Sequence, residues 1–265
     1  MNSRETLLYL ALKYKGDWNP IYEDISNHVD IDEEEAKKLI ATVNSNYITI
    51  LDEEYPESLK DSYKAPFVLF YYGDISLLSD KNNKIAVVGS RKYTEYGEKM
   101  TQMLVKGIAK DFVVVSGMAY GIDAIAHRSA IESGGKTIGV LGNGINFHYL
   151  EENKDIYEEC KKNHLVISEY PDITPPNPAC FPIRNRIIAG LCNNLLVAEG
   201  KVRSGTQITA FLMVQKSGNV CCVPTRAGED SICNYLIKEG AYLVETIDDI
   251  YLYTGVKPQK PIFEK

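Results

Sequence analysis

The sequence predicts an α/β fold, built on a doubly wound, mostly parallel sheet and preceded by a small helical N-terminal domain. From Lys84 onward, short runs rich in Val and Ile alternate with amphipathic helical segments. These runs are apolar at consecutive positions, which is typical of strands that are buried on both faces. The hydrophobic content of 45% and charged content of 25% are those of an ordinary globular protein.

The N-terminal domain, residues 1–45, is predicted to be helical over residues 3–42. Leucines at positions 7–12 indicate a first helix, and a polar break follows at residues 15–20. A second helix is expected to begin at Asp32, whose carboxylate can accept hydrogen bonds from free backbone N–H groups. Its acidic first turn also suits the helix dipole. We interpret this domain as a helical cap with a solvated acidic face.

A connector, residues 46–80, leads into the core and is predicted to contain one short strand at 67–72, ended by Gly73 and Asp74. The core is expected to span residues 81–250, and a C-terminal tail follows at 251–265. The predicted core strands are residues 85–88, 112–115, 137–141, 164–167, 195–198 and 220–223.

The charge of the chain is unevenly distributed. The net charge is -7, but residues 1–80 hold 7 Lys and Arg against 16 Asp and Glu, whereas residues 81–265 hold 22 against 20. A binding site needs only a local cluster of cations, so the acidic total does not exclude a nucleic-acid partner.

Other features of composition limit the function classes. The sequence shows neither an apolar stretch that could span a bilayer nor a basic and apolar leader, so we expect a cytoplasmic protein without membrane association. The six cysteines form no Cys-x-x-Cys pair, which favours free thiols over zinc ligands or disulfides. We therefore predict no metal site and no cofactor.

Four predicted strands are followed by glycine-containing loops, at residues 89–91, 116–123, 142–144 and 199–206. In a parallel sheet such loops meet at the carboxyl edge, where ligands bind. Glycine lets the backbone approach a ligand closely, and N–H groups at a helix start favour an anion. The loops also contain side chains that can donate hydrogen bonds to an anion, namely Ser90, Arg91, Ser116, Arg203, Ser204 and Thr206. Together these features predict a phosphate pocket.

The segment 177–190 allows two interpretations. Phe181 precedes Pro182 at the start of a helix that carries Arg184, Asn185 and Arg186. In the first interpretation the arginines bind phosphates and the ring stacks on a base of single-stranded nucleic acid. In the second the ring lies in the core and the arginines pair with acids such as Glu169 or Glu199. The residue chemistry alone leaves both open.

Six motifs follow one another along the chain: Gly89–Arg91, Ser116–Arg128, Val140–Gly144, Ser168–Pro171, Phe181–Leu191 and Ser204–Ala210. In this order and at this spacing, with the connector before them, they closely resemble the DNA-processing protein A (DprA/Smf) family over residues 46–245. The resemblance implies an extended Rossmann-like fold that binds single-stranded DNA and hands it to a RecA-type recombinase, as a homodimer. Many members carry a C-terminal winged-helix module, which is not found before Lys265.

The resemblance also implies which residues bind DNA. They are Arg91, a basic residue before the Ser-Gly-Thr loop (Lys201 or Arg203), and Phe181 with Arg184 and Arg186. It implies no catalytic residue. With their neighbours, the predicted DNA-binding residues are Gly89, Ser90, Arg91, Ser116, Gly117, Phe181, Arg184, Asn185, Arg186, Lys201, Arg203, Ser204, Gly205 and Thr206. The dimer is expected to use the sheet end around residues 215–245, whose Ile232, Leu236 and Ile237 suit either an interface or the core.

A nucleotide-binding sensor that uses the same strand-end pocket is the main alternative. Nucleotide hydrolysis of the phosphoribohydrolase type would need a glutamate where this chain has Thr209. Asp123 and His127 stand four residues apart on one predicted helix, so they can face the same way. We interpret the aspartate as a brace for the loop and the histidine as part of the packing.

Overall fold

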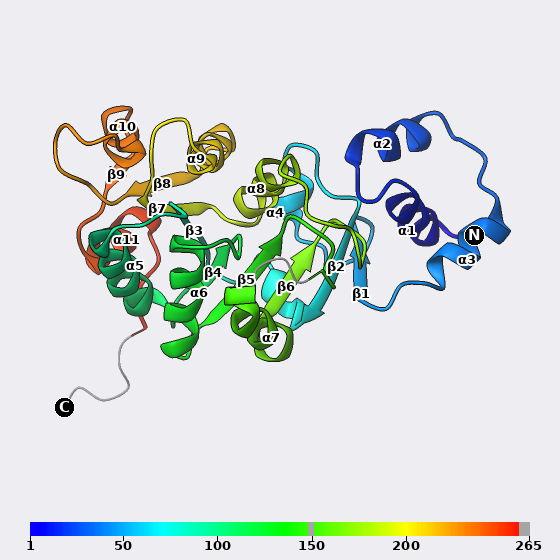
Figure 1. Cartoon of the computed structure of the whole chain (residues 1–265), viewed down its shortest axis with the longest axis horizontal. Coiled ribbons are helices and arrows are strands. Elements are labelled where there is room, and N and C mark those ends of the chain that lie inside the picture. The colour runs from blue at the N-terminus through cyan, green and yellow to red at the C-terminus, as the bar shows by residue number, and fades with distance from the viewer. Residues whose placement is uncertain (148–150, 260–265) are drawn as a thin grey trace.

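The fold is a nine-stranded sheet covered by helices on both faces (Figure 1). The computed structural model describes residues 1–147 and 151–259. The strand order is β1-β2-β6-β5-β4-β3-β7-β8-β9. The bounds are β1 Asn46–Thr49, β2 Val68–Gly73, β3 Lys84–Gly89, β4 Val113–Ser116, β5 Lys136–Leu141, β6 Leu165–Ser168, β7 Asn194–Glu199, β8 Asn219–Cys222 and β9 Tyr242–Leu243.

The six core strands lie within two residues of their predicted positions, and they are parallel throughout. The predicted fold class is therefore confirmed. The connector contributes more than one strand, because β1 and β2 form an antiparallel pair and β2 is antiparallel to β6. From β3 the chain adds β4, β5 and β6 on one side and then β7 and β8 on the other, so the switch point of the sheet lies at the carboxyl ends of β3 and β7.

Two helical layers sandwich the sheet. One face packs α4 (Glu57–Lys60), α8 (Cys180–Leu191), α9 (Gly205–Gln215) and α10 (Ile232–Lys238) against side chains such as Val88 and Val197. Figure 1 shows α8, α9 and α10 along one side of the sheet and α5, α6 and α7 along the other. The second layer is α5 (Glu95–Ile108), α6 (Ile122–Glu132), α7 (Lys154–Asn163) and α11 (Ile247–Thr254).

The N-terminal helices are α1 (Ser3–Lys13), α2 (Trp18–Ser26) and α3 (Glu33–Ile40), and they lie beside β1 and β2 (Figure 1). Asp32 caps α3 as expected, accepting from the N–H groups of Glu34 and Glu35. The predicted break between helices at residues 15–20 is wrong from Trp18 onward, because α2 begins at that residue. Pro20 stands in the first turn of α2, where a backbone N–H has no helical partner to lose.

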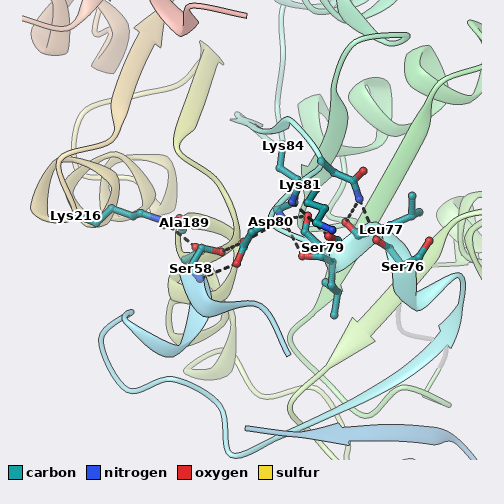
Figure 2. Close-up of polar contacts among 12 residues, drawn as sticks. Ser58, Ser76, Leu77, Ser79, Asp80, Lys81, Lys84, Ala189 and Lys216 are labelled. Carbon is teal, nitrogen blue, oxygen red and sulfur yellow. Dashed lines mark hydrogen bonds and ion pairs between the residues drawn. The ribbon is translucent and has the colours of Figure 1, made fainter. Parts of the chain in front are cut away.

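The buried Lys84 and the half-buried Lys216 hold the connector and α8 in place at the amino edge of the sheet (Figure 2). The Lys84 ammonium donates to the carbonyls of Leu78 (2.8 Å) and Ser79 (2.7 Å), and it pairs with Asp80. Lys216 donates to the last carbonyls of α8, those of Ala189 and Gly190. Burial lowers the pKa of both lysines, but the carbonyls around each ammonium replace the water that it loses.

None of the helices in residues 1–147 and 151–259 combines the length and apolar character needed to cross a bilayer. The division of the chain at residues 45, 80 and 250 stays a prediction. Residues 260–265 of the expected tail lie outside the described residues.

Candidate functional site

A pocket opens at the carboxyl ends of β3, β4 and β5, beside the first turns of α8. Three of the four predicted glycine loops contribute to its wall, and α7 closes the far side. We call this the strand-end pocket. Its lining residues are Arg91, Gly117, Met118, Ala119, Tyr120, Leu141, Gly142, Asn143, Phe147, Asn153, Lys154, Tyr157, Phe181 and Arg184.

Arg91 and Phe181 meet at this pocket. The guanidinium carbon of Arg91 lies 5.4 Å from the centre of the Phe181 ring, a cation–π distance. Arg91 is exposed to solvent, whereas Phe181 is half-buried. Gly142 makes room for the ring, because a Cβ atom there would collide with it. The fold thus brings an exposed cation and an aromatic ring together, although they lie about 90 residues apart in the sequence.

Arg184 is the buried brace of the pocket. Its guanidinium donates to the carbonyl of Gly117 at 2.5 Å and to that of Val140, so it joins the ends of β4 and β5. A side chain at position 117 would collide with the guanidinium, which explains the glycine. Burial lowers the pKa of Arg184 to about 10, and the nearby Asp123 carboxylate opposes that shift. The side chain is 4% exposed, so a phosphate contact would require it to move.

Asp123 and His127 are both buried in α6, as the sequence interpretation expected. The Asp123 carboxylate accepts from the N–H of Ala119, within the loop that follows β4. Burial raises the pKa of the Asp123 carboxyl group, and the nearby Arg184 guanidinium opposes this rise. The His127 Nδ1 atom pairs with the Thr137 hydroxyl at 2.6 Å. Ser116 is also enclosed, since its hydroxyl donates to the Val87 carbonyl. These groups shape the loop from below and do not line the pocket.

Arg186 forms a bidentate ion pair with Glu169, the residue that follows β6. Its two terminal nitrogens lie 3.0 and 2.5 Å from the carboxylate oxygens, and both side chains are almost completely buried. This is the pairing that the second interpretation of segment 177–190 expected. Glu199, the other acid considered there, instead accepts hydrogen bonds from Thr94. A phosphate contact by Arg186 would therefore require the ion pair to open.

The loop after β7 carries two exposed cations, Lys201 and Arg203. It lies beside the loop after β3, because the Ser90 N–H donates to the Glu199 carbonyl. Asn185 of α8 donates to the carbonyl of Gly205 at 3.3 Å, which ties the loop to the helix that carries Phe181. Arg203 has a φ of 61°, in the left-handed region that favours glycine. Such strain in a non-glycine residue often marks a functional loop.

The predicted site residues thus fall into three groups. Those lining the strand-end pocket are Arg91, Gly117, Phe181 and Arg184. Those on the neighbouring exposed surface are Lys201, Arg203 and Gly205, while Ser204 and Asn185 are half-buried. The remaining residues are enclosed, or hold the loops together through their own hydrogen bonds and close packing: Gly89, Ser90, Ser116, Arg186 and Thr206.

The sequence did not reveal several residues of the pocket wall. Phe147 and Asn143 follow β5, and the Asn143 side chain donates to the Phe147 carbonyl at 2.8 Å. Tyr157 and Lys154 come from α7, whose position relative to the pocket follows from the tertiary fold alone. Phe147 could have been found from the sequence, because it follows a glycine loop and stands at a position where a dinucleotide-binding loop would have glycine.

Comparison with known proteins identifies the family. The model of the family described as DNA recombination-mediator protein A matches residues 46–254. The DNA processing protein DprA of Streptococcus pneumoniae is 43% identical over 204 residues, which cover 76% of this chain and 72% of the relative. This chain belongs to the DNA recombination-mediator protein A family. The Bacillus subtilis DprA is 39% identical over 209 residues, covering 78% of this chain and 70% of that protein.

Solved structures of the DprA family have the same fold. The crystal structure of DprA from Streptococcus pneumoniae superposes with a TM-score of 0.80 at 34% identity, covering 96% of this chain and 94% of that one. The DprA of Helicobacter pylori, whose structural study concerns its single-stranded DNA binding mode, superposes with a TM-score of 0.71 at 26% identity. That match covers 82% of this chain and 99% of the Helicobacter chain.

Proposed function

We propose that this DprA-family protein binds single-stranded DNA across the strand-end pocket and the loop after β7, and helps to load it onto a RecA-type recombinase. The observation that carries the proposal is the exposed guanidinium of Arg91 beside the Phe181 ring. A cation next to an aromatic face can bind a phosphate and stack the attached base at once. Single-stranded DNA binding by the Helicobacter pylori relative supports the same assignment.

The arginines take two different roles in this proposal. Arg91, Lys201 and Arg203 are exposed, so they contact phosphates directly. Arg184 and Arg186 act as positioning residues, because their guanidinium groups hold backbone carbonyls and Glu169. The sequence predicted that all of these cations bind DNA. We keep them in the proposed site, with Arg184 and Arg186 acting indirectly, by holding the loops in place.

The proposed role is a non-enzymatic one in the cytoplasm. Thr209, at the position where a phosphoribohydrolase needs its glutamate, is buried and lies 3.5 Å from the Gly205 carbonyl. A threonine hydroxyl cannot act as the general acid or base of that reaction at neutral pH. The proposal accordingly assigns the pocket to binding rather than to hydrolysis.

We propose that a homodimer forms at the β9 end of the sheet. Ile232 and Leu236, two of the residues considered for this interface, are buried in the core, and Ile237 packs against it. The apolar side chains that remain exposed there belong to α10 and β9, with 38% to 40% of each accessible: Tyr235, Tyr242 and Leu243. Because β9 is an edge strand, a second copy can cover these side chains and the edge together.

The recombinase is proposed to contact α9. Phe211 and Val214 project from this helix with 45% and 57% of their surfaces exposed. The helix begins directly after Arg203 and Ser204, so a partner seated on it would lie beside the bound strand. A Phe211→Asp variant is expected to bind DNA as the unchanged protein does and to lose recombinase loading, measured by the displacement of a single-strand-binding protein.

Fluorescence anisotropy tests the DNA-binding proposal. A labelled oligo-dT strand, a matched duplex, and a set of mononucleotides and cyclic nucleotides are titrated with the full chain over a salt series. Preference for the single strand with a steep salt dependence supports the proposal. Saturable binding of a small nucleotide without strand binding would overturn it in favour of a nucleotide sensor.

A further inference from the structure

A second groove lies on the other side of the first turn of α8, between that helix and the N-terminal helices. One wall is the turn at residues 14–19 together with Tyr63 and Lys64, and the other is residues 174–183 with Ile208 and Leu212 of α9. We call it the aromatic groove. Its volume of about 930 Å³ is at the upper end of the range for ligand clefts, so it has room for an extended ligand.

The N-terminal wall of the groove carries the rings of Trp18 and Tyr63 and the ammonium of Lys64. Trp18 stacks on Tyr22, with ring centres 4.8 Å apart, and on Phe67 at 5.4 Å. The Lys64 ammonium lies 5.1 Å from the centre of the Trp18 ring and 5.6 Å from that of Tyr63. Tyr63 is 67% exposed, so its ring is open to a ligand. An accessible ring beside a cation is the arrangement on which single-stranded nucleic acids stack.

The groove adjoins the strand-end pocket. Phe181 lines the pocket, whereas its neighbours Cys180, Pro182 and Ile183 line the groove. The first turn of α8 therefore separates the two sites. Ile183 is 47% exposed on that turn.

The local charge suits a phosphate backbone, although the N-terminal third of the chain is acidic. The groove is lined by Lys15 and Lys64, against the single open carboxylate of Asp17 among its described lining residues. Glu169, the other acid in the lining, is neutralised by Arg186. The apolar lining would also suit a peptide, but the cation beside aromatic rings and the nearness of the strand-end pocket favour a nucleic acid.

We infer that the aromatic groove is a second subsite for the same DNA strand, which stacks its bases on Tyr63 and places phosphates at Lys64 and Lys15. The inference rests on the proposed function. It predicts that the groove contributes to the binding of long strands only, because a short strand is held within the strand-end pocket.

The test compares the affinities of the full chain for two oligo-dT strands. The strand of about 6 nucleotides falls within the site sizes of single-strand-binding folds, and the strand of about 20 nucleotides exceeds them. Tyr63→Ala and Lys64→Gln should each weaken binding of the long strand by about five- to tenfold and leave the short strand unchanged. Tyr63→Phe keeps the ring and should bind both strands as the unchanged protein does. Arg91→Ala should weaken both lengths.

The outcomes separate the inference from the proposed function. If Tyr63→Ala and Lys64→Gln bind the long strand with unchanged affinity while Arg91→Ala is impaired, the groove is not on the path of the strand, and a peptide becomes its expected occupant. If the unchanged protein binds neither length, the proposed function fails and the inference fails with it.

Discussion

The guanidinium carbon of Arg91 lies 5.4 Å from the centre of the Phe181 ring, although the two residues belong to separate elements that both line the strand-end pocket. Neither residue needs the other for its own local structure: Arg91 stands in the loop after β3, and Phe181 in the first turn of α8. Their proximity is therefore a property of the assembled sheet edge, and it can be probed by removing one partner at a time.

Arg91→Ala and Phe181→Leu should weaken single-stranded DNA binding in different ways. Loss of the guanidinium removes about one phosphate contact, so the slope of log affinity against log salt should fall by about 0.7. Loss of the ring should cost about 1 to 3 kcal/mol of binding free energy and leave the slope unchanged. Anisotropy titrations over a salt series measure both quantities. Lys110→Ala, an exposed charge after α5 at the opposite edge, is the control and should change neither.

The buried pair of Arg186 and Glu169 should show strong coupling. Replacing either residue alone leaves the other charge buried without a partner, which should cost about 3 to 5 kcal/mol of unfolding free energy. The double variant Arg186→Met with Glu169→Met should cost much less than the sum of the two single changes. Urea unfolding of the four proteins gives the cycle. Additive costs would show that the pair acts as two independent side chains.

Much of the fold could be predicted because its strands are apolar on both faces. Runs such as Ile85–Val88 identify buried parallel strands without reference to any partner. The start of α2 was missed, since Trp18 and Pro20 read as a break until the cap at Asp17 is placed. The connector strand β2 was predicted, but its antiparallel pairing with β1 and with β6 was not, because β6 lies about 100 residues further along the chain.

The candidate site was predictable in its position but not in the roles of its arginines. Glycine loops after parallel strands locate the pocket by topology alone. Whether Arg184 and Arg186 face solvent depends on Gly117, Val140 and Glu169, which come near them only in the folded chain. The sequence could name Glu169 as one possible partner, and only the fold, which brings the residue after β6 next to Arg186 of α8, shows that the pair forms.

His127 should make the protein less stable in mild acid. Burial lowers its pKa to about 3 in the folded state, from 6.5 for the free side chain. Between these values the unfolded chain binds a proton that the folded chain does not. His127 should therefore not reduce the unfolding free energy above pH 6.5. At lower pH the unfolding free energy should decrease, by up to about 1.4 kcal/mol per pH unit.

Urea unfolding at a series of pH values checks this prediction. His127→Asn can still pair with Thr137 but does not titrate, so its stability should depend less on pH below 6.5. Some dependence should remain, because burial also lowers the pKa of His164. A slope for the Asn variant equal to that of the unchanged protein would assign the acid sensitivity to other groups.

Arg203→Gly should separate DNA binding from stability. Glycine adopts the observed φ of 61° without a steric penalty, so the variant should be as stable as the unchanged protein or more stable by up to about 1 kcal/mol. It should nevertheless bind single-stranded DNA more weakly, because an exposed cation of the loop after β7 is lost. Arg203→Ala loses the same charge and keeps the strain. Equal melting temperatures for the two variants would contradict this explanation.

The pairing of β2 with β6 has a consequence for how the protein resists self-association. Along the ladder from Phe70–Ser168 to Gly73–Leu165, the connector covers backbone groups of a strand that would otherwise end the sheet. A fragment that starts at residue 81 would keep the four strand-end loops but leave β6 as an open, apolar edge. Such an edge recruits strands from other molecules. The connector strand β2 therefore covers an edge through which the parallel core would be expected to pair with other copies.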